Sequence, residues 1–247
     1  MDETKNQATK RREFIQICSA AVATNIATNV APALAAPSSA PATARKYARV
    51  KLVDVDNKPL KLKSLKTNHN YVFNYPYAAT PCFLLKLDAS VDEKVGLKTE
   101  KGAKYDWPGG AGPEKKLVAY SAICAHKLAY PTPQVSFIGF RASASGASSR
   151  GNVITCCADK SVYDPAAGAK VMSGPAPQPL ATILLEHDAK TDELFAVGTF
   201  GGERFNEFFA KYDFKLKLEM GDRAKDETKT VAVVKDLANY SAQTAQC

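Results

Sequence analysis

Hydrophobic and polar residues alternate in short runs along much of the chain, a pattern typical of β-strands with one buried face. Glycine and proline clusters separate the runs, and no long segment repeats with the 3.6-residue period of a helix. Seven strands are predicted, at residues 47–55, 70–75, 82–87, 117–123, 153–156, 182–187 and 193–199. Short strands joined by loops favour an all-β fold, either an antiparallel β-sandwich or a partly open barrel.

Two long segments interrupt this strand pattern, at residues 88–114 and 134–152. Segments of that length are usually functional or disordered. The second contains a polar tract at residues 143–149, and we expect this segment either to cover a site or to dock a partner. After residue 212 the chain continues with two more strand-like runs, at residues 213–220 and 230–234.

The N-terminal sequence is typical of a leader peptide. Residues 9–15, Thr-Lys-Arg-Arg-Glu-Phe-Ile, resemble a twin-arginine export signal, and they precede an apolar stretch at residues 17–30 and a small-residue site at 33–36. We predict a signal peptide over residues 1–36 and a periplasmic protein. An amphipathic N-terminal helix is the alternative.

Composition narrows the function classes. The hydrophobic fraction of 45% is that of a globular protein. Asn25 and Asn29 interrupt the apolar stretch, which is shorter than the roughly 20 residues of a membrane span, so a retained anchor is disfavoured. The formal net charge is +8, but no run of lysine and arginine is interleaved with aromatic residues as in a nucleic-acid surface.

Two short segments carry candidate metal ligands. The first reads Cys124-Ala125-His126, and the second reads Cys156-Cys157-Ala158-Asp159. Thiolates favour iron–sulfur clusters or zinc, and imidazole also suits iron. Cys124, His126, Cys156 and Asp159 are therefore the predicted ligands, and we call the two segments the first and second box.

The boxes resemble those of the Rieske [2Fe–2S] family, which read Cys-x-His and Cys-x-x-His, the second usually continuing Gly-Ser-x-Tyr/Phe-Asp. Ser161, Tyr163 and Asp164 match that continuation. Residues 173–180 resemble the proline loop that covers the cluster in this family. The resemblance implies a Rieske-type [2Fe–2S] cluster in a cluster-binding subdomain of the β-fold.

Three positions depart from the family pattern. Asp159 stands where the second histidine is expected, Lys160 replaces the glycine, and the first box lacks its second cysteine. Two histidines raise the potential of a Rieske centre, so a carboxylate ligand predicts a lower potential. The missing outer histidine also argues against direct quinol oxidation. The alternative is that the cluster has been lost and the fold serves as a structural subunit.

Five of the six cysteines remain if the leader, with Cys18, is removed. In an oxidising compartment, cysteines that do not bind iron are expected to pair or to be buried. Cys157 lies beside a predicted ligand and cannot easily bind the same iron. We therefore predict a disulfide between Cys157 and either Cys82 or Cys247.

Further segments resemble the family of arsenite oxidase small subunits, at residues 74–77, 80–87, 112–114, 117–124 and 196–198. This resemblance implies an electron-transfer subunit without catalytic residues of its own. In that family the Rieske subunit takes electrons from a large molybdopterin subunit and passes them to a soluble cytochrome c or copper protein. A molybdopterin or haem protein as the larger partner would support this relay. The alternatives are the iron–sulfur subunit of a quinol-oxidising cytochrome bc-type complex, which would have a cytochrome b partner, or a structural subunit that has lost the cluster.

The predicted domain organisation has four parts. A signal peptide at residues 1–36 and a linker at residues 37–46 precede a Rieske-like domain at residues 47–212. Residues 213–247 form a C-terminal extension, expected to wrap a partner or to close a sheet edge, with a flexible terminus as the alternative.

Overall fold

The computed structural model describes residues 41–91 and 94–247. The predicted export signal lies outside these residues and stays a prediction. The strands are β1 (Arg45–Val53), β2 (Tyr71–Asn74), β3 (Pro81–Lys86), β4 (Val95–Lys98), β5 (Lys104–Trp107), β6 (Leu117–Ser121), β7 (Val135–Ser136), β8 (Ile138–Arg141), β9 (Val153–Cys156), β10 (Ser161–Asp164), β11 (Lys170–Ser173), β12 (Thr182–Asp188), β13 (Glu193–Phe200), β14 (Val231–Val233), β15 (Lys235–Asp236) and β16 (Gln243–Thr244). The helices are α2 (Phe205–Met220) and α3 (Leu237–Tyr240), with short 3₁₀ turns η2 (Leu62–Ser64), η3 (Pro165–Ala167) and η4 (Gly221–Lys225).

The predicted all-β class is confirmed, and each of the seven predicted strands is present with ends within two residues of those expected. Across residues 41–91 and 94–247, no helix has the length and apolar character needed to cross a membrane.

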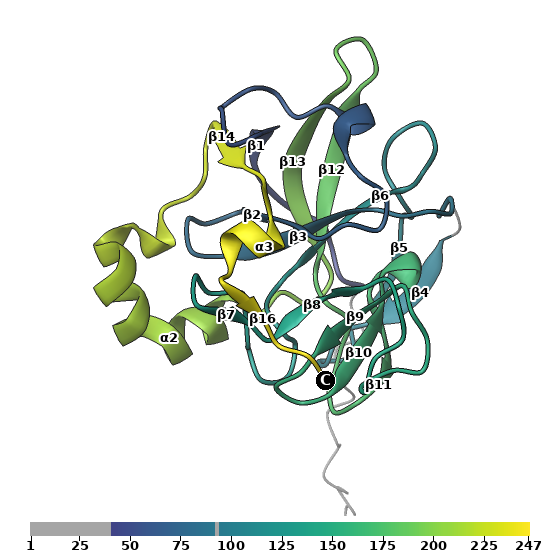
Figure 1. Cartoon of the computed structure of the whole chain (residues 1–247), viewed down its shortest axis with the longest axis vertical. Coiled ribbons are helices and arrows are strands. Elements are labelled where there is room, and N and C mark those ends of the chain that lie inside the picture. The colour runs from purple at the N-terminus through teal and green to yellow at the C-terminus, as the bar shows by residue number, and fades with distance from the viewer. Residues whose placement is uncertain (1–40, 92–93) are drawn as a thin grey trace, which may run out of the picture. The chain divides into compact units, whose positions relative to one another are not determined.

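The larger sheet has eight strands in the order β14-β1-β13-β12-β6-β3-β2-β15 (Figure 1). β14 pairs in parallel with β1, whereas β15 pairs antiparallel with β2 at the opposite edge. Only Val234 separates β14 from β15, and its amide donates to the carbonyl of Val53 over 2.8 Å. The C-terminal segment therefore joins the two edges of the sheet, which removes the exposed edges that invite aggregation.

A smaller sheet, in the order β11-β10-β9-β8, packs against the larger one, and Figure 1 shows it below β6. β3 connects the two cores because its side chains alternate between them. Leu84 lies in the core inside the large sheet, whereas Phe83 and Leu85 pack toward Ile154 and Tyr163 of the small sheet. Burial of β3 on both faces explains why its sequence is a continuous apolar run.

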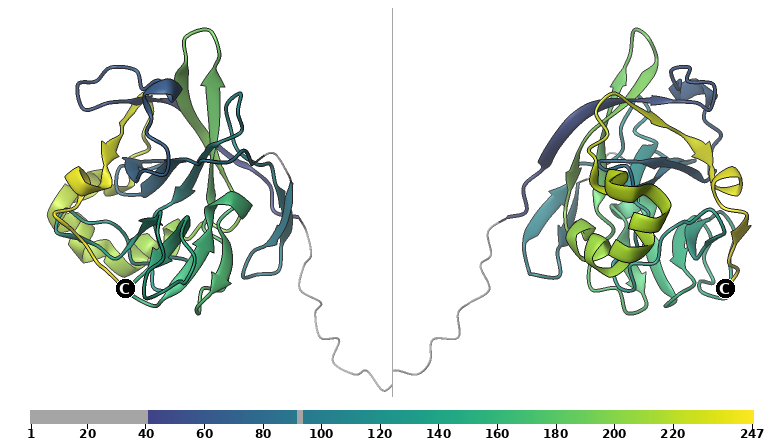
Figure 2. Two further views of the ribbon diagram at one scale, coloured as in Figure 1. Left: turned by 45° about the vertical axis from the view of Figure 1, so that its right-hand side comes forward. Right: turned by 90° about the vertical axis from the view of Figure 1, so that its left-hand side faces the viewer.

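The strand predicted at residues 213–220 is wrong, because this segment is the C-terminal half of α2. Phe205, Phe208 and Phe209 are buried at helical spacing, and they pack on Ile123 and Leu128 around the first box. Lysine and leucine alternate near the end of the segment, and this alternation resembles the sequence pattern of a β-strand. That alternation does not mark a buried face, since Phe214 and Leu218 are 76% and 73% exposed. Figure 2 shows α2 on the outside of the described domain.

The first residues of the long segment at 134–152 contact the second box, since the amide of Cys157 donates to the carbonyl of Phe137 over 2.6 Å. The segment supplies β8, which pairs with β9 and forms one edge of the small sheet. Its polar tract instead contacts the C-terminus, since the amide of Ala147 donates to the carbonyl of Cys247 over 3.1 Å. The segment at residues 88–114 contributes the β4–β5 hairpin, which the sequence pattern did not reveal.

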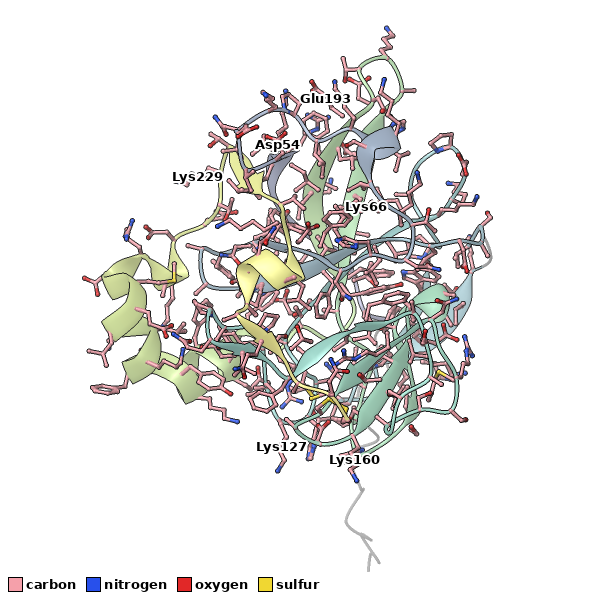
Figure 3. All side chains as sticks on the ribbon, in the orientation of Figure 1. Asp54, Lys66, Lys127, Lys160, Glu193 and Lys229 are labelled. Atoms are coloured by element: carbon pink, nitrogen blue, oxygen red, sulfur yellow. A yellow bond between two sulfur atoms is a disulfide. The ribbon has the colours of Figure 1, made fainter. Side chains whose placement is uncertain are left out.

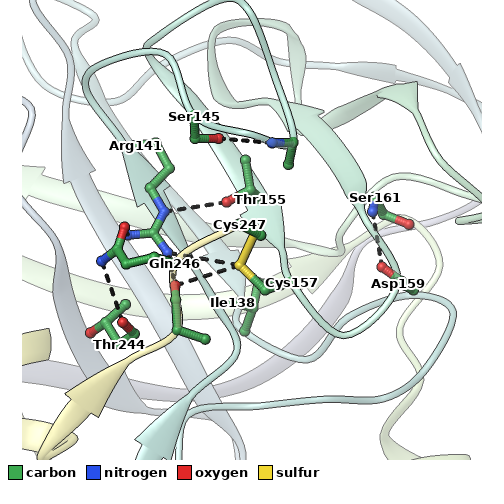
Figure 4. Close-up of a disulfide and its surroundings, with 12 residues drawn as sticks. Ile138, Arg141, Ser145, Thr155, Cys157, Asp159, Ser161, Thr244, Gln246 and Cys247 are labelled. Carbon is green, nitrogen blue, oxygen red and sulfur yellow. Dashed lines mark hydrogen bonds between the residues drawn. A yellow bond between two sulfur atoms is a disulfide. The ribbon is translucent and has the colours of Figure 1, made fainter.

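The predicted disulfide of Cys157 is confirmed, with Cys247 as its partner (Figure 4). Cys82 is excluded because it is fully buried in the core of the large sheet as a free thiol. Before reaching the disulfide, the tail forms α3 and then β16, which pairs in parallel with β7. Residues 235–247 thus form a strap that ties the large sheet to the second box.

Replacing Cys247 with serine is expected to lower the free energy of unfolding by roughly 2–5 kcal/mol, since the disulfide closes a loop with a sequence separation of 90 residues. Urea unfolding followed by circular dichroism measures the loss. Replacing the neighbouring Gln246 with serine is the control and should leave the midpoint unchanged. Equal midpoints for the Cys247 variant and the unmodified protein would show that the strap holds without the disulfide.

Candidate metal centre

The first box is a tight loop that follows β6. The amide of Cys124 donates to the carbonyl of Ala129 over 2.8 Å, and the amide of Leu128 donates back to the carbonyl of Cys124 over 3.0 Å. Leu128 has a positive φ of 58°, which lets the chain reverse within a few residues. These bonds hold the thiol of Cys124 in the interior and leave His126 at the surface.

The second box is the turn of the β9–β10 hairpin. Cys156 ends β9 opposite Ser161, and the amide of Lys160 donates to the carbonyl of Cys156 over 2.8 Å. Lys160 has a φ of 60°, a conformation that glycine adopts without cost. This explains the glycine of the family pattern, and a lysine here costs about 1 kcal/mol. Cys156 points inward, whereas Cys157 points outward to its disulfide.

Although 29 residues lie between the two boxes, the fold brings Cys124, Cys156 and Asp159 into one group and places His126 against Asp159. The ligand atoms of Cys124, Cys156 and Asp159 all lie within 4.8 Å of one another. Oδ2 of Asp159 lies 3.2 Å from Sγ of Cys124 and 3.0 Å from Nδ1 of His126. Both thiols are fully buried, whereas the side chain of His126 is 36% exposed.

The carboxyl group of Asp159 is held by both of its oxygens. Oδ1 accepts the amide of Ser161 over 2.9 Å (Figure 4), so Oδ2 is directed at Cys124 and His126. Burial alone would raise the pKa of the Asp159 carboxyl, but hydrogen bonds from the Ser161 amide and the Cys124 thiol outweigh it and hold that pKa below its ordinary value. Asp159 is therefore an ionised carboxylate with only 2% of its side chain exposed.

The two thiols lie beside this carboxylate, and each changes the pKa of the other. A hydrogen bond from the Cys156 thiol outweighs burial and lowers the pKa of Cys124, while the same contact, together with burial, raises the pKa of Cys156. Two thiolates and a carboxylate cannot all carry charge in so small a buried space without a cation. The site is thus suited to a metal.

Tyr163 approaches the site from β10. Its hydroxyl oxygen lies 3.5 Å from Sγ of Cys124 and accepts the amide of Ala125 over 3.3 Å. Burial raises the pKa of the Tyr163 phenol far above its ordinary value, so the hydroxyl keeps its proton. Because the oxygen already accepts from Ala125, its own proton is available to donate to the sulfur of Cys124.

Replacing Tyr163 with phenylalanine is expected to lower the reduction potential of a centre bound here by roughly 40 mV. A hydrogen bond to a ligand sulfur strengthens when the centre is reduced, and about 1 kcal/mol corresponds to that shift for one electron. Potentiometric titration measures it. Tyr120 is the matched control, since its hydroxyl is buried but donates to the carbonyl of Pro165. A Tyr163 variant with the same potential as the Tyr120 variant would exclude this role.

The predicted proline loop, residues 173–180, lies on the second box. Gly174 has a φ of 88°, and a Cβ there would lie 2.5 Å from Cα of Ser161. The amide of Ala176 donates to the hydroxyl of Ser161 over 3.2 Å. Close approach of the loop to the hairpin turn thus requires glycine at this position.

Two residues of the site were not predicted, because they are distant in sequence and belong to no motif. Nη1 of Arg204 donates to the carbonyl of Ala125 over 2.7 Å, and Nζ of Lys211 donates to the carbonyl of Lys127 over 2.6 Å. Both belong to the α2 region, so the helix holds the backbone of the first box from outside.

The donor set fits a [2Fe–2S] cluster in its chemistry, since the thiols can bind one iron, and His126 and Asp159 the other. The distances between the ligand atoms, however, must change before a cluster can bind. Ligands of a single tetrahedral metal lie roughly 3.3–3.8 Å apart, and the 3.2 Å between Sγ of Cys124 and Oδ2 of Asp159 is just below that range. Ligands of different irons are further apart, so the Asp159 carboxylate must turn away from Cys124 to admit the cluster.

No protein-family model matches the chain. Among solved structures, the chain is similar to the soluble domain of the Rieske protein II (soxF) from Sulfolobus acidocaldarius, with 25% identity over 64% of this chain and 82% of that chain, and a TM-score of 0.45. Because a TM-score this low does not establish a common fold, the function proposed below is based on the residues and geometry of the site itself.

Proposed function

We propose that this protein is an iron–sulfur electron-transfer protein that holds a Rieske-type [2Fe–2S] cluster between its two boxes. The observation that carries the proposal is the convergence of two buried free thiols, an ionised carboxylate and an imidazole on one site. Cys124 and Cys156 would bind the inner iron, and His126 and Asp159 the outer one. Such a cluster supplies one-electron transfer.

The chain's own residues position the cluster and set its environment. The thiols of Cys124 and Cys156 are buried, and the proline loop packs over the second box. Together these features keep water from the two inner ligands. Tyr163 donates to a ligand sulfur. His126 is the one predicted ligand with an exposed side chain, so electrons would enter and leave along its outer edge.

As a relay, the protein would serve a larger catalytic subunit. The resemblance to arsenite oxidase small subunits and the twin-arginine motif support a periplasmic subunit that passes electrons from a molybdopterin chain to a cytochrome c. A quinol-oxidising role is less well supported, because the ionised Asp159 has no ring N–H to offer a quinol.

The test is to purify the protein anaerobically from its native host and to measure iron and acid-labile sulfide. About two irons and two sulfides per chain, with a Rieske-like EPR signal after reduction, are expected. Co-purification of a molybdopterin chain supports the arsenite oxidase-like assembly, and a cytochrome b partner would support the quinol alternative instead.

A second candidate is a single bound metal ion, favoured by the 3.2 Å between Sγ of Cys124 and Oδ2 of Asp159. It would give about one metal per chain and no sulfide. A colourless protein with neither metal nor sulfide would show that the cluster has been lost, and the chain would then be a structural subunit.

A further inference from the structure

We propose that three lysines around the exposed edge of His126 form a docking surface for an acidic redox partner. The three are Lys127, Lys160 and Lys211, and we call them the lysine rim. This inference rests on the proposed function, because it identifies where the partner that exchanges electrons with the site would bind.

The exposed edge of His126 is defined by how its ring is held. Nδ1 faces inward, 3.0 Å from the buried carboxylate of Asp159. The opposite edge of the ring, with Nε2, therefore accounts for the exposed 36% of the side chain. Among the four predicted ligands, this edge is the shortest route from the site to a partner, because both thiols and Asp159 are buried.

Each rim lysine is placed beside a ligand by the backbone. Lys127 follows His126, and Lys160 follows Asp159, and both are exposed. Figure 3 shows these two side chains at the same end of the domain, below the disulfide. Lys211 is exposed on α2 and reaches the first box, where its ammonium group lies 2.6 Å from the carbonyl of Lys127. Segments distant in sequence thus bring three cations to one surface.

The charge of the rim is not neutralised by the protein. Within the described part of the chain, none of the three lysines forms an ion pair. Glu100 and Glu207 share Arg204 as their partner, which leaves one negative charge against the three of the rim, so the surface keeps a net positive charge. Asp159 is only 2% exposed.

The three lysines can influence docking because they lie close to the site where electrons would leave. At physiological salt, charges more than about 8 Å apart are largely screened, so only cations close to the electron exit influence docking there. A rim with net positive charge around that exit attracts a surface rich in carboxylates and raises the rate of association. The partner that fits is therefore a redox protein whose own electron-transfer site is surrounded by acidic residues.

The rim could instead serve only to offset the negative charge of the thiolates and Asp159. The two roles differ in what they affect. Charge compensation alters the potential of the bound centre, whereas a docking surface alters binding to an anionic surface even when no metal is present.

The test compares two triple variants of equal net charge. One replaces the rim (Lys127→Gln, Lys160→Gln and Lys211→Gln), and the control replaces three exposed lysines that also lack ion pairs (Lys66→Gln, Lys190→Gln and Lys229→Gln). Figure 3 places Lys66 and Lys229 in the half of the domain away from Lys127 and Lys160. The probes are a carboxylate-terminated monolayer for adsorption and hexacyanoferrate(III) for oxidation of the reduced protein.

The rim variant is expected to adsorb at least fivefold more weakly than the control variant, and to react with hexacyanoferrate(III) about tenfold more slowly at low salt, with the difference vanishing at high salt. Equal adsorption of the two variants overturns the docking surface. The adsorption measurement does not need the cluster, so loss of the proposed electron transfer and failure of the docking proposal give different results.

Discussion

Serine in place of Cys124 or Cys156 is expected to abolish binding of the cluster, leaving less than about one tenth of the iron of the unmodified protein. A serine hydroxyl is far less acidic than a thiol and is a hard ligand, so it does not replace a soft thiolate on iron. Both thiols are fully buried and face the same centre, so no other described cysteine can substitute. Iron analysis and visible circular dichroism measure the loss.

Cys82→Ser is the matched control. Cys82 is the third free cysteine, equally buried, but its thiol donates to the carbonyl of Tyr75 in the core of the large sheet. This variant should keep its iron, and far-ultraviolet circular dichroism should show that all three variants are folded. Iron retained at normal stoichiometry in the Cys124 and Cys156 variants would refute the ligand assignment.

Replacing Asp159 with histidine is expected to raise the reduction potential by about 100–200 mV. The substitution exchanges an anionic ligand for a neutral one, and removing a negative charge next to the irons makes the reduced state less unfavourable. Asp159 is suited to this test because its Oδ2 already lies 3.0 Å from Nδ1 of His126, where the second ligand of the outer iron belongs. A redox titration followed by EPR measures the shift.

The control for the Asp159 variant is Glu100→Gln, which also removes a carboxylate, but one that pairs with Arg204 at the surface. Its potential should change by less than about 20 mV, because exposed charges are screened by water and salt. A histidine variant whose potential equals that of the control would mean that the carboxylate of Asp159 is not bound to iron.

A buried carboxylate at the proposed cluster and a rim of exposed lysines around it would give the site two opposite charges. In the proposed cluster, Asp159 would make the centre one unit more negative than a two-histidine centre, while Lys127, Lys160 and Lys211 would keep the outer surface positive. The two proposals therefore predict that Asp159 mainly affects the potential and that the lysine rim mainly affects the choice of partner.

The predicted ligands could be read from the sequence because each lies in a short box whose spacing reflects local geometry. Cys156 and Asp159 share one hairpin turn, and Cys124 and His126 share one loop. The supporting residues could not be predicted. Arg204 and Lys211 bond to the first box from about 80 positions away, and a pattern of neighbouring residues carries no signal of such a contact.

The sequence by itself determined the β class, the position of the central strands and the candidate ligands, because alternation of apolar residues and ligand spacing are local properties. Only the tertiary structure decided that residues 205–220 form a helix over the first box, that β14 and β15 join the edges of the large sheet, and that Cys247 rather than Cys82 pairs with Cys157. The helix, the closure of the sheet and the disulfide partner all depend on which surfaces meet after folding. Burial of Phe208 against the first box outweighs the strand-like alternation of α2, just as burial of Cys82 in the core removes it as a disulfide partner.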